Sequence, residues 1–154
     1  MTVETGQPAP DFSAPATGDQ TLSLSDFHGK TLVLYFYPKD NTPGCTQEGQ
    51  DFRDPHAEFQ AAGAQILGVS RESIRSHENF KAKFEFPFEL LSDPDETLCK
   101  AYDVMKEKNM YGRKYMGVER STFVIDPQGM LRHEWRKVKV KGHAQAVLDA
   151  VKSI

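Results

Sequence analysis

TLVLYFYPKDNTPGC, residues 31–45, is the stretch that decides the fold. Its first seven residues form a near-continuous run of apolar, β-branched and aromatic side chains, which is typical of a central strand covered on both faces. The residues that follow include Pro38, Pro43 and Gly44, and they end at Cys45. This order predicts that a buried strand turns into a helix at Cys45, with Pro43 in the first helical turn.

Outward from this stretch, strands and helices alternate along the chain. The expected elements are a hairpin before residue 31, helices over 45–54 and 56–62, a strand over 64–70, a helix over 73–84, a strand over 88–91, a helix over 96–102, strands over 121–125 and 130–138, and a helix after Gly142. Residues 106–117 are polar and contain two glycines, so we expect a loop there. The order predicts an α/β fold with a central mixed sheet flanked by helices. A thioredoxin-like arrangement with an N-terminal β-hairpin, in one domain over residues 1–154, is the economical choice.

Two of the predicted helices have a recognisable apolar face. The stripe of the 73–84 helix consists of Ile74, His77, Phe80, Lys81 and Phe84, and the face of the last helix consists of Ala146, Val147, Ala150 and Val151.

The composition is that of an ordinary folded protein. Hydrophobic residues make up 38% of the 154 residues and charged residues 27%, so the combination of low hydrophobicity and high net charge that marks disorder is absent. The formal net charge of -3 provides no general attraction for phosphate backbones or anionic lipid. We therefore expect no nucleic acid and no membrane as a partner.

The first residues, MTVETGQPAP, have neither the basic start nor the apolar run of a secretory signal. No apolar stretch approaches the roughly 18 residues that span a bilayer. We therefore expect a cytoplasmic protein. A reducing compartment would keep both cysteines, Cys45 and Cys99, as thiols.

Residues 136–141, RKVKVK, form the one basic cluster. Its basic residues alternate with Val138 and Val140, which predicts a strand with one solvated face. A basic binding patch is the weaker interpretation.

Cys45 is the candidate nucleophile. A thiol in the first turn of a helix lies near unpaired backbone N–H groups and the positive end of the helix dipole, which favour its ionised form, the thiolate. Thr42, three residues earlier, can direct a hydroxyl at the sulfur. Free cysteines are usually small buried hydrophobes, but the junction formed by Thr42, Pro43 and Gly44 is a place where backbone donors face outward and anions bind.

Arg120 is the candidate cation of the site, because it directly precedes the strand predicted over residues 121–125. Its guanidinium stays charged and offers several N–H donors, which suits a thiolate and the negative charge that develops on a reacting oxygen. Without the Cys45 motif, a surface ion pair with Glu119 or Asp126 would be the better interpretation of this arginine.

These segments resemble the peroxiredoxins, the thiol peroxidases. The spacing P-x-x-x-T-x-x-C of Pro38, Thr42 and Cys45 is similar to their active-site motif. The surrounding YFYPKDNTPGCT resembles the bacterioferritin comigratory (peroxiredoxin Q) subfamily, RSTFVID at residues 120–126 resembles the segment that carries the family's arginine, and GQPAPDF at residues 6–12 resembles the family's opening GxxAPDF. The resemblance covers nearly the whole chain.

The resemblance implies a role for each matching residue. Pro38 would shield the cysteine from water, the Thr42 hydroxyl would bond to the incoming peroxide, and Arg120 would orient the thiolate and the substrate. Gly44 would support the site as part of the junction. Glu48 matches a position where many peroxiredoxins carry a glutamate that helps to hold the arginine, and a carboxylate on the helix surface is an equally good interpretation of it.

One position departs from the subfamily. Members often carry a second, resolving cysteine five residues after the first, where this sequence has Gln50. The sulfenic acid of Cys45 would then be resolved by Cys99 or by a thiol of another molecule. Cys99 lies beside core positions of a predicted helix, so we interpret it as a packed thiol and expect a one-cysteine cycle.

The expected function is that of a thiol-dependent peroxidase. It would reduce hydrogen peroxide or organic hydroperoxides through Cys45 sulfenic acid, with thioredoxin, glutaredoxin or a low-molecular-weight thiol as the reductant, and the subfamily resemblance implies a monomer. The five histidines are scattered without the paired spacing of a metal site, and we expect no metal and no bound cofactor.

Two other functions stay open at this point. Thiol-disulfide exchange of the thioredoxin type needs a C-x-x-C pair, whereas residues 45–48 read CTQE. A redox sensor or relay, which passes oxidation from Cys45 to a partner protein, would have the same active site.

Overall fold

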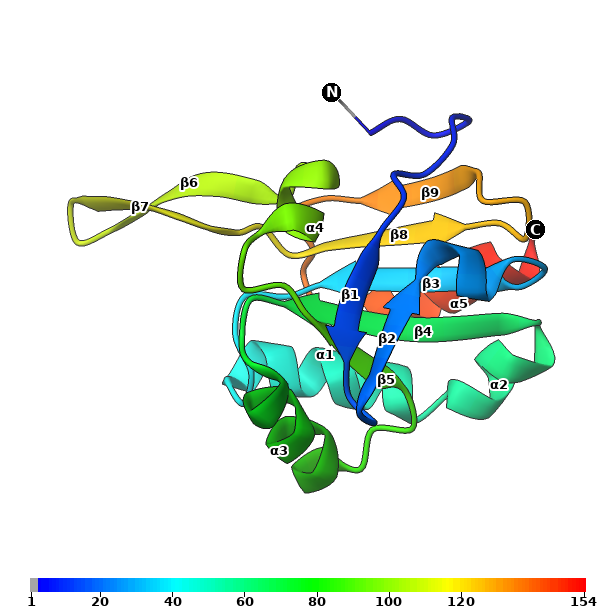
Figure 1. Cartoon of the computed structure of the whole chain (residues 1–154), viewed down its shortest axis with the longest axis horizontal. Coiled ribbons are helices and arrows are strands. Elements are labelled where there is room, and N and C mark those ends of the chain that lie inside the picture. The colour runs from blue at the N-terminus through cyan, green and yellow to red at the C-terminus, as the bar shows by residue number, and fades with distance from the viewer. Residues whose placement is uncertain (1–2) are drawn as a thin grey trace.

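The computed structural model describes residues 3–154, in which a seven-stranded mixed sheet has helices on both of its faces (Figure 1). The strands lie in the order β2, β1, β5, β4, β3, β8, β9. Their bounds are β1 (Ser13–Ala16), β2 (Gln20–Ser23), β3 (Thr31–Phe36), β4 (Ala64–Ser70), β5 (Glu89–Ser92), β8 (Ser121–Ile125) and β9 (Leu131–Trp135). The pairs β3–β4 and β4–β5 are parallel, and β3–β8 is antiparallel. The expected central mixed sheet is therefore confirmed.

Strand β3 lies inside the sheet between β4 and β8, and all six of its residues are buried. Successive side chains of a strand point to opposite faces, so β3 contributes to two separate cores. Leu34 and Phe36 pack in one core with the N-terminal segment and α4 (Thr97–Ala101). Val33 and Tyr35 pack in the other core, beneath the remaining helices.

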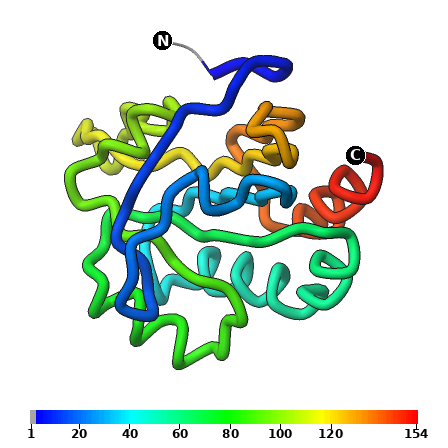
Figure 2. Tube along the Cα trace, turned by 45° about the vertical axis from the view of Figure 1, so that its right-hand side comes forward, coloured from blue at the N-terminus to red at the C-terminus, as the bar shows by residue number. Residues whose placement is uncertain are grey.

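Four helices cover this second face. They are α1 (Pro43–Arg53), α2 (His56–Ala61), α3 (Ile74–Phe84) and α5 (His143–Lys152). Each contributes buried apolar side chains to the core, for example Phe52, Phe59, Phe80 and Val147. Figure 2 shows α1 and α2 in sequence along one side of the sheet. Pro55 separates them, because its ring cannot continue a helix.

No helix within the described residues has both the length and the apolar character needed to cross a bilayer.

The expected N-terminal hairpin is present, and it is part of the main sheet. β1 and β2 pair antiparallel, and β1 also pairs with β5 through Ala16 and Leu91. A short 3-10 helix, η1 (Leu24–Phe27), leads from the hairpin to β3.

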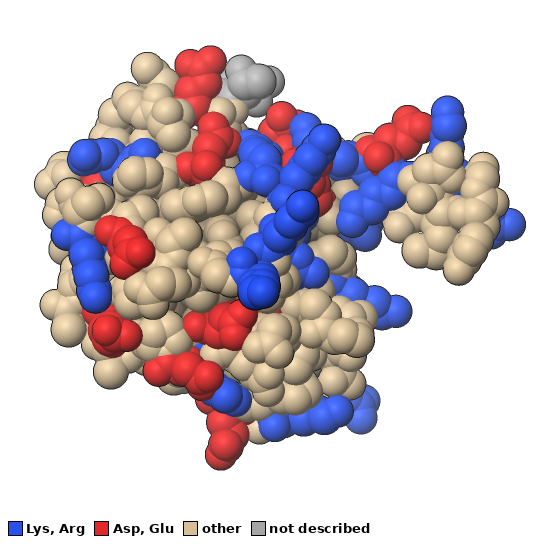
Figure 3. Space-filling model, turned by 180° about the vertical axis from the view of Figure 1, so that it is seen from behind, with Lys and Arg blue, Asp and Glu red and all other residues tan. Residues whose placement is uncertain are grey.

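Residues 106–117 are not a loop, as the sequence predicted, but a two-stranded antiparallel arm made by β6 (Met105–Met110) and β7 (Arg113–Val118). The arm projects from the body of the molecule (Figures 1 and 3), and it exposes Met110 and Tyr111 at its tip and Tyr115 and Met116 along β7. Tyr111 and Gly112 both have positive φ, at 53° and 78°, which is the backbone of a tight two-residue hairpin turn. The prediction failed because the arm buries almost no side chains, so no hydrophobic pattern marks its strands.

The basic cluster at 136–141 does not form the predicted strand, because β9 ends at Trp135. Lys137 has φ of +49°, which interrupts an extended backbone. Arg136 instead turns inward and donates to the carbonyl oxygens of Asp103 at 2.6 Å and Tyr102 at 3.0 Å. This arginine is therefore a structural contact rather than part of a solvated basic face.

The expected stripe of α3 is confirmed, since all five of its residues are buried or half-buried. The expected face of α5 is only partly right, because Val147 and Val151 are buried but Ala146 is exposed. The helix starts at His143, whose ring is buried and lies 2.8 Å from the Thr122 hydroxyl. Ala144 and Leu148, which the prediction left out, are buried instead of Ala146.

Candidate active site

Cys45 lies in the first turn of α1, which follows β3 after the loop of residues 37–42. Thr42 is the N-cap residue of this helix, with an extended backbone at φ -102° and ψ 157°. Pro43 occupies the first helical position, where its missing N–H costs nothing. The backbone N–H groups of Gly44 and Cys45 belong to the first turn, which has no intrahelical acceptors for them. The expected strand-to-helix junction thus places the sulfur at the donor-rich end of a helix.

Arg120 meets both Cys45 and Glu48. It lies between β7 and β8, and its Nη2 is 3.4 Å from the Cys45 sulfur while its Nη1 donates to Glu48 Oε1 at 2.6 Å. Cys45 is 2% exposed and Glu48 1% exposed. The structure therefore brings together three residues from two distant parts of the sequence, and it places Glu48 inside the protein rather than on the helix surface.

Because Gly44 has no side chain, the guanidinium of Arg120 can lie close to the helix backbone. A Cβ atom on Gly44 would lie 3.2 Å from Arg120 Nη2, which is tighter than most real contacts of this kind. Gly44 therefore lets the arginine lie close against the helix that carries the cysteine.

Burial affects the protonation of both Glu48 and Arg120. Loss of water raises the pKa of Glu48 to about 7, although Arg120 opposes this shift. Burial by itself would lower the pKa of Arg120, but the negative charges of Glu48 and Cys45 outweigh it and raise the pKa. The guanidinium stays charged, whereas Glu48 can exchange a proton near neutral pH.

Thr42 and Pro38 lie in the loop that leads to the helix, and the structure does not bring Thr42 into contact with the sulfur as the sequence suggested. The Thr42 hydroxyl donates to the Lys39 carbonyl oxygen at 2.8 Å. Its oxygen keeps lone pairs that can accept a hydrogen bond from another molecule. Pro38 is half-buried, directly after the buried Tyr37.

Lys108 on the arm adds a cation that the sequence analysis missed. Its aliphatic part lies against Gly117, where a Cβ atom would meet Lys108 Cδ at 3.1 Å. Burial lowers the pKa of Lys108, and Arg120 and Arg71 lower it further, whereas Cys45 raises it. The ammonium group therefore lies within electrostatic reach of the site. To predict Lys108 from the sequence, residues 105–118 would first have to be recognised as two paired strands.

Tyr35 on β3 is a second residue near the site that no sequence motif marks. Its hydroxyl and Glu48 Oε2 are buried atoms without a hydrogen-bond partner among residues 3–154. Burial raises the pKa of Tyr35, and Glu48 and Cys45 raise it further. The alternation of β3 could have identified it, since residue 35 shares its face with the helix that carries Cys45.

Cys99 lies away from Cys45, on the opposite face of the sheet. It is fully buried in the core with Leu34 and Phe36, whereas Cys45 belongs to the core with Val33 and Tyr35. Burial raises the pKa of Cys99, as do its contacts with Asp93. Cys99 is therefore held as a neutral packed thiol.

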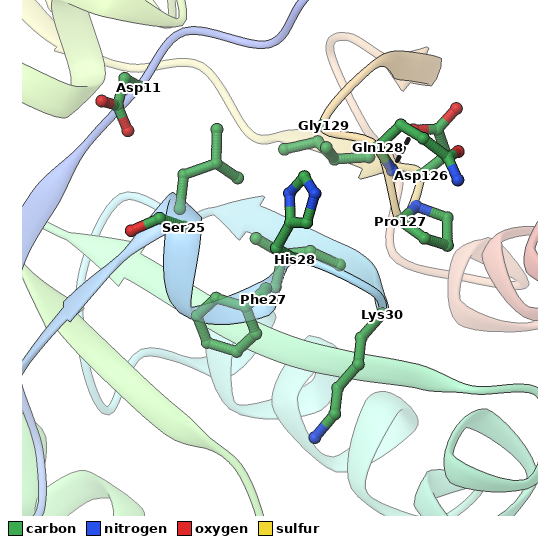
Figure 4. Close-up of a pocket in the computed structure, with 12 residues that line it drawn as sticks. Asp11, Ser25, Phe27, His28, Lys30, Asp126, Pro127, Gln128 and Gly129 are labelled. Atoms are coloured by element: carbon green, nitrogen blue, oxygen red, sulfur yellow. Dashed lines mark hydrogen bonds between the residues drawn. The ribbon is translucent and has the colours of Figure 1, made fainter.

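A cavity of about 250 Å³ lies elsewhere, between η1 and the turn that joins β8 to β9 (Figure 4). Phe27 and His28 line one side of it, and residues 126–129 line the other. It contains none of the predicted site residues. Within the described residues, no group of three or more His, Cys, Asp and Glu is arranged to hold a metal ion.

Comparison with known proteins identifies the class of protein that this fold and site define. The sequence model of the AhpC/TSA family matches residues 5–134. Peroxiredoxin Bcp of Xanthomonas campestris is 57% identical over 148 residues, which cover 95% of this chain and 92% of that protein. Peroxiredoxin Bcp of Bacillus subtilis is 51% identical over 154 residues, covering 100% of this chain and 98% of the relative.

Solved structures agree with these relatives. A structure of Xanthomonas campestris peroxiredoxin Q has a TM-score of 0.89 at 56% identity and covers 92% of this chain and 90% of its own. A mutant of peroxiredoxin Q from Xylella fastidiosa has a TM-score of 0.94 at 44% identity, with coverage of 99% and 98%. The chain belongs to the AhpC/TSA family, as a thiol-dependent peroxidase of its bacterioferritin comigratory (peroxiredoxin Q) subfamily.

Proposed function

We propose that Cys45 is the peroxidatic residue of this peroxidase and that Arg120, Thr42 and Pro38 complete its active site. The observation that carries the proposal is the single guanidinium that contacts both the Cys45 sulfur and the buried carboxylate of Glu48. One nitrogen stabilises the thiolate, and the ion pair with Glu48 holds the guanidinium in place.

In the reaction, the thiolate sulfur forms a bond to the terminal oxygen of the peroxide while the O–O bond breaks. Sulfur is oxidised by two electrons to the sulfenic acid, and the leaving oxygen takes up one proton to become water or an alcohol. Arg120 stabilises the negative charge on the transferring oxygens, and the Thr42 oxygen accepts a hydrogen bond from the peroxide O–H. Pro38 limits the access of water, and Gly44 leaves room for the guanidinium.

The substrates are hydrogen peroxide and organic hydroperoxides. A solved bacterioferritin comigratory protein of Xanthomonas campestris, 52% identical to this chain over 97% of its length, has alkyl peroxide reduction activity. The likeness of fold and sequence supports the same chemistry here, with no bound cofactor.

The second half of the cycle uses a thiol from another molecule. Cys99 lies on the other face of the sheet, and residue 50 is a glutamine, so neither position offers the sulfenic acid a thiol within the same chain. An external thiol attacks the sulfenic sulfur and releases water, and a second thiol restores Cys45. Thioredoxin, glutaredoxin or a low-molecular-weight thiol can supply both electrons.

The protein is proposed to act as a monomer in the cytoplasm, where its thiols stay reduced. The two edge strands of the sheet support the monomer, because β2 is only four residues long and polar and β9 carries charged side chains, both of which disfavour pairing with another sheet. Sedimentation of the reduced protein as a dimer would contradict this.

Mass spectrometry tests the one-cysteine cycle. After one equivalent of peroxide, the intact protein should gain one oxygen on Cys45, and the Cys45→Ser variant should gain none and lose rapid peroxide consumption. Cys99→Ser should behave as the wild type. A disulfide between the two cysteines would overturn the cycle, and substantial turnover by Cys45→Ser would overturn the proposed function. Slow turnover with every reductant, together with a trapped mixed disulfide to one partner protein, would instead favour the redox relay.

A further inference from the structure

Asp40 lies in the loop between Pro38 and Thr42, and its carboxylate is the centre of a buried hydrogen-bond network. It accepts from the Tyr37 hydroxyl at 2.6 Å, the Ser76 hydroxyl at 2.7 Å and His77 Nδ1 at 2.7 Å. Tyr37 directly follows β3, whereas Ser76 and His77 lie on α3. One side chain therefore connects the loop of the candidate active site to a helix more than thirty residues away in the sequence.

His77 is fully buried, and both of its ring nitrogens face acceptors. Nδ1 lies 2.7 Å from the Asp40 carboxylate, and Nε2 lies 2.8 Å from the Leu91 carbonyl oxygen. A carbonyl oxygen can only accept, and the ionised carboxylate can only accept as well. Both contacts are satisfied only when each ring nitrogen carries a proton, which makes the ring a cation.

Other contacts tie the same loop to the same region. The Asp40 backbone N–H donates to Glu72 Oε1 at 2.8 Å, and Ser70 donates to the same oxygen at 2.9 Å. Lys83 near the end of α3 donates to the Asn41 side chain at 3.2 Å. The loop is thus bonded through side chains and through its own backbone.

We propose that Asp40 and His77 form a buried ion pair that positions the loop of residues 38–42 against Cys45. Neither residue touches the sulfur, so both are positioning residues. This role rests on the proposed function, since the loop carries Pro38 and Thr42. Neutralising one partner would leave the other charge buried and unpaired, and the loop would shift to expose it. Small displacements of groups that hold a substrate reduce rates by large factors.

Nitrogen NMR of the histidine ring tests the ion pair directly in the full chain. At neutral pH we expect both His77 nitrogens to have the chemical shifts of protonated nitrogens, and this signature should vanish in Asp40→Asn. A wild-type ring with one unprotonated nitrogen would overturn the ion pair. This measurement does not depend on whether the protein consumes peroxide.

Stopped-flow oxidation of Cys45 tests the positioning role. We expect Asp40→Asn to slow the reaction with hydrogen peroxide about tenfold to a hundredfold at a temperature where the variant stays folded. Asp93→Asn is the matched control, because Asp93 is an equally buried carboxylate that accepts the backbone N–H groups of Leu98 and Cys99 on the other face of the sheet. It should lose stability and keep the rate within about twofold.

Equal rates for Asp40→Asn and the wild type would overturn the positioning role, and so would equal losses in Asp40→Asn and Asp93→Asn. If Asp40→Asn does not fold, Ser76→Ala removes one half-buried donor to the same carboxylate, and an unchanged rate in that variant would overturn the role. A wild type that does not react with peroxide would instead overturn the proposed function, while the NMR result would still decide the ion pair.

Discussion

Glu48 is the residue on which the charge balance of the site depends. With the thiolate of Cys45 and the cation of Arg120, an ionised Glu48 gives the cluster a net charge of minus one, whereas a protonated Glu48 leaves it neutral. Burial brings the pKa of Glu48 to about 7, so both forms occur near neutral pH. The site therefore carries a carboxylate whose protonation state changes near neutral pH.

The same shift predicts the pH dependence of stability. The pKa of Glu48 is about 7 in the folded protein against 4.5 ordinarily, so between these values the folded state binds more protons than the unfolded state. The contribution of Glu48 to the free energy of unfolding therefore falls as the pH rises from about 4.5 to 7. Urea unfolding of wild type and Glu48→Gln across this range should show the slope in the wild type and a flatter dependence in the variant. Parallel curves would contradict the assignment.

Gly44→Ala should weaken the reaction through the arginine. The added Cβ would lie 3.2 Å from Arg120 Nη2, so the guanidinium must move by a few tenths of an ångström. We expect oxidation of Cys45 to slow by about tenfold, because a misplaced donor stabilises the transition state less. Stability should fall little, since alanine favours a helix over glycine. Stopped-flow kinetics and thermal unfolding check the two effects, and an unchanged rate would show that the glycine has no such role.

At the scale of residues, sequence could supply Cys45, Arg120 and Glu48 as candidates because motif positions mark them. It could not supply Lys108 or Tyr35. Lys108 lies on a strand that no hydrophobic pattern reveals, and Tyr35 is one of several aromatic residues in a buried run. The bonding of the Thr42 hydroxyl to Lys39 was also beyond sequence, because it depends on the exact course of the loop.

The arm of β6 and β7 is the element that behaves least like the rest of the fold. Within residues 3–154 its strands pair only with each other, and full burial is confined to Gly117 and Val118 at its base. A two-stranded hairpin without a core is marginally stable by itself. The arm therefore depends on its turn and on its attachment to β8 for its shape.

Gly112→Ala should destabilise the arm alone. Gly112 has φ of +78°, where a side chain costs about 1 kcal/mol, and no neighbouring atom lies within 4 Å of its Cβ position. Hydrogen exchange should become roughly fivefold faster for arm amides and stay unchanged for amides of β3. An equal acceleration in β3 would show that the arm and the sheet unfold together.

At the scale of the whole molecule, the two-faced sheet was predictable because buried strands are continuous apolar runs and helices are periodic ones. The predictions failed where the residues are polar or where one residue with positive φ changes the direction of the chain. These places are the arm and the segment after Trp135. A local turn with positive φ at Tyr111 and Gly112 decides the arm, and the contacts of Arg136 with the carbonyl oxygens of Tyr102 and Asp103 decide the segment after Trp135. Neither feature leaves a hydrophobic pattern in the sequence.

Acid should weaken the whole fold through Asp40. Burial by itself would raise the pKa of Asp40, but its hydrogen bonds and the charge of His77 outweigh it and lower the pKa. A lowered carboxylate pKa contributes stability above the ordinary value of 3.8 that is lost as the pH falls through the folded value. At neutral pH, Asp40→Asn should cost about 3 kcal/mol, and this difference should shrink below pH 3.8. Urea titrations at several pH values measure both, and a constant difference would contradict the assignment.

The alternation of β3 also restricts how this chain can vary. Inserting or deleting one residue within β3 would move each later side chain of the strand to the opposite face of the sheet. Phe36 and Tyr37 would then exchange cores, and Cys45 would lie on the wrong face. Substitutions by side chains of similar size in either core leave the backbone unchanged. Variants of this protein should therefore differ in the composition of residues 31–37 and keep their number.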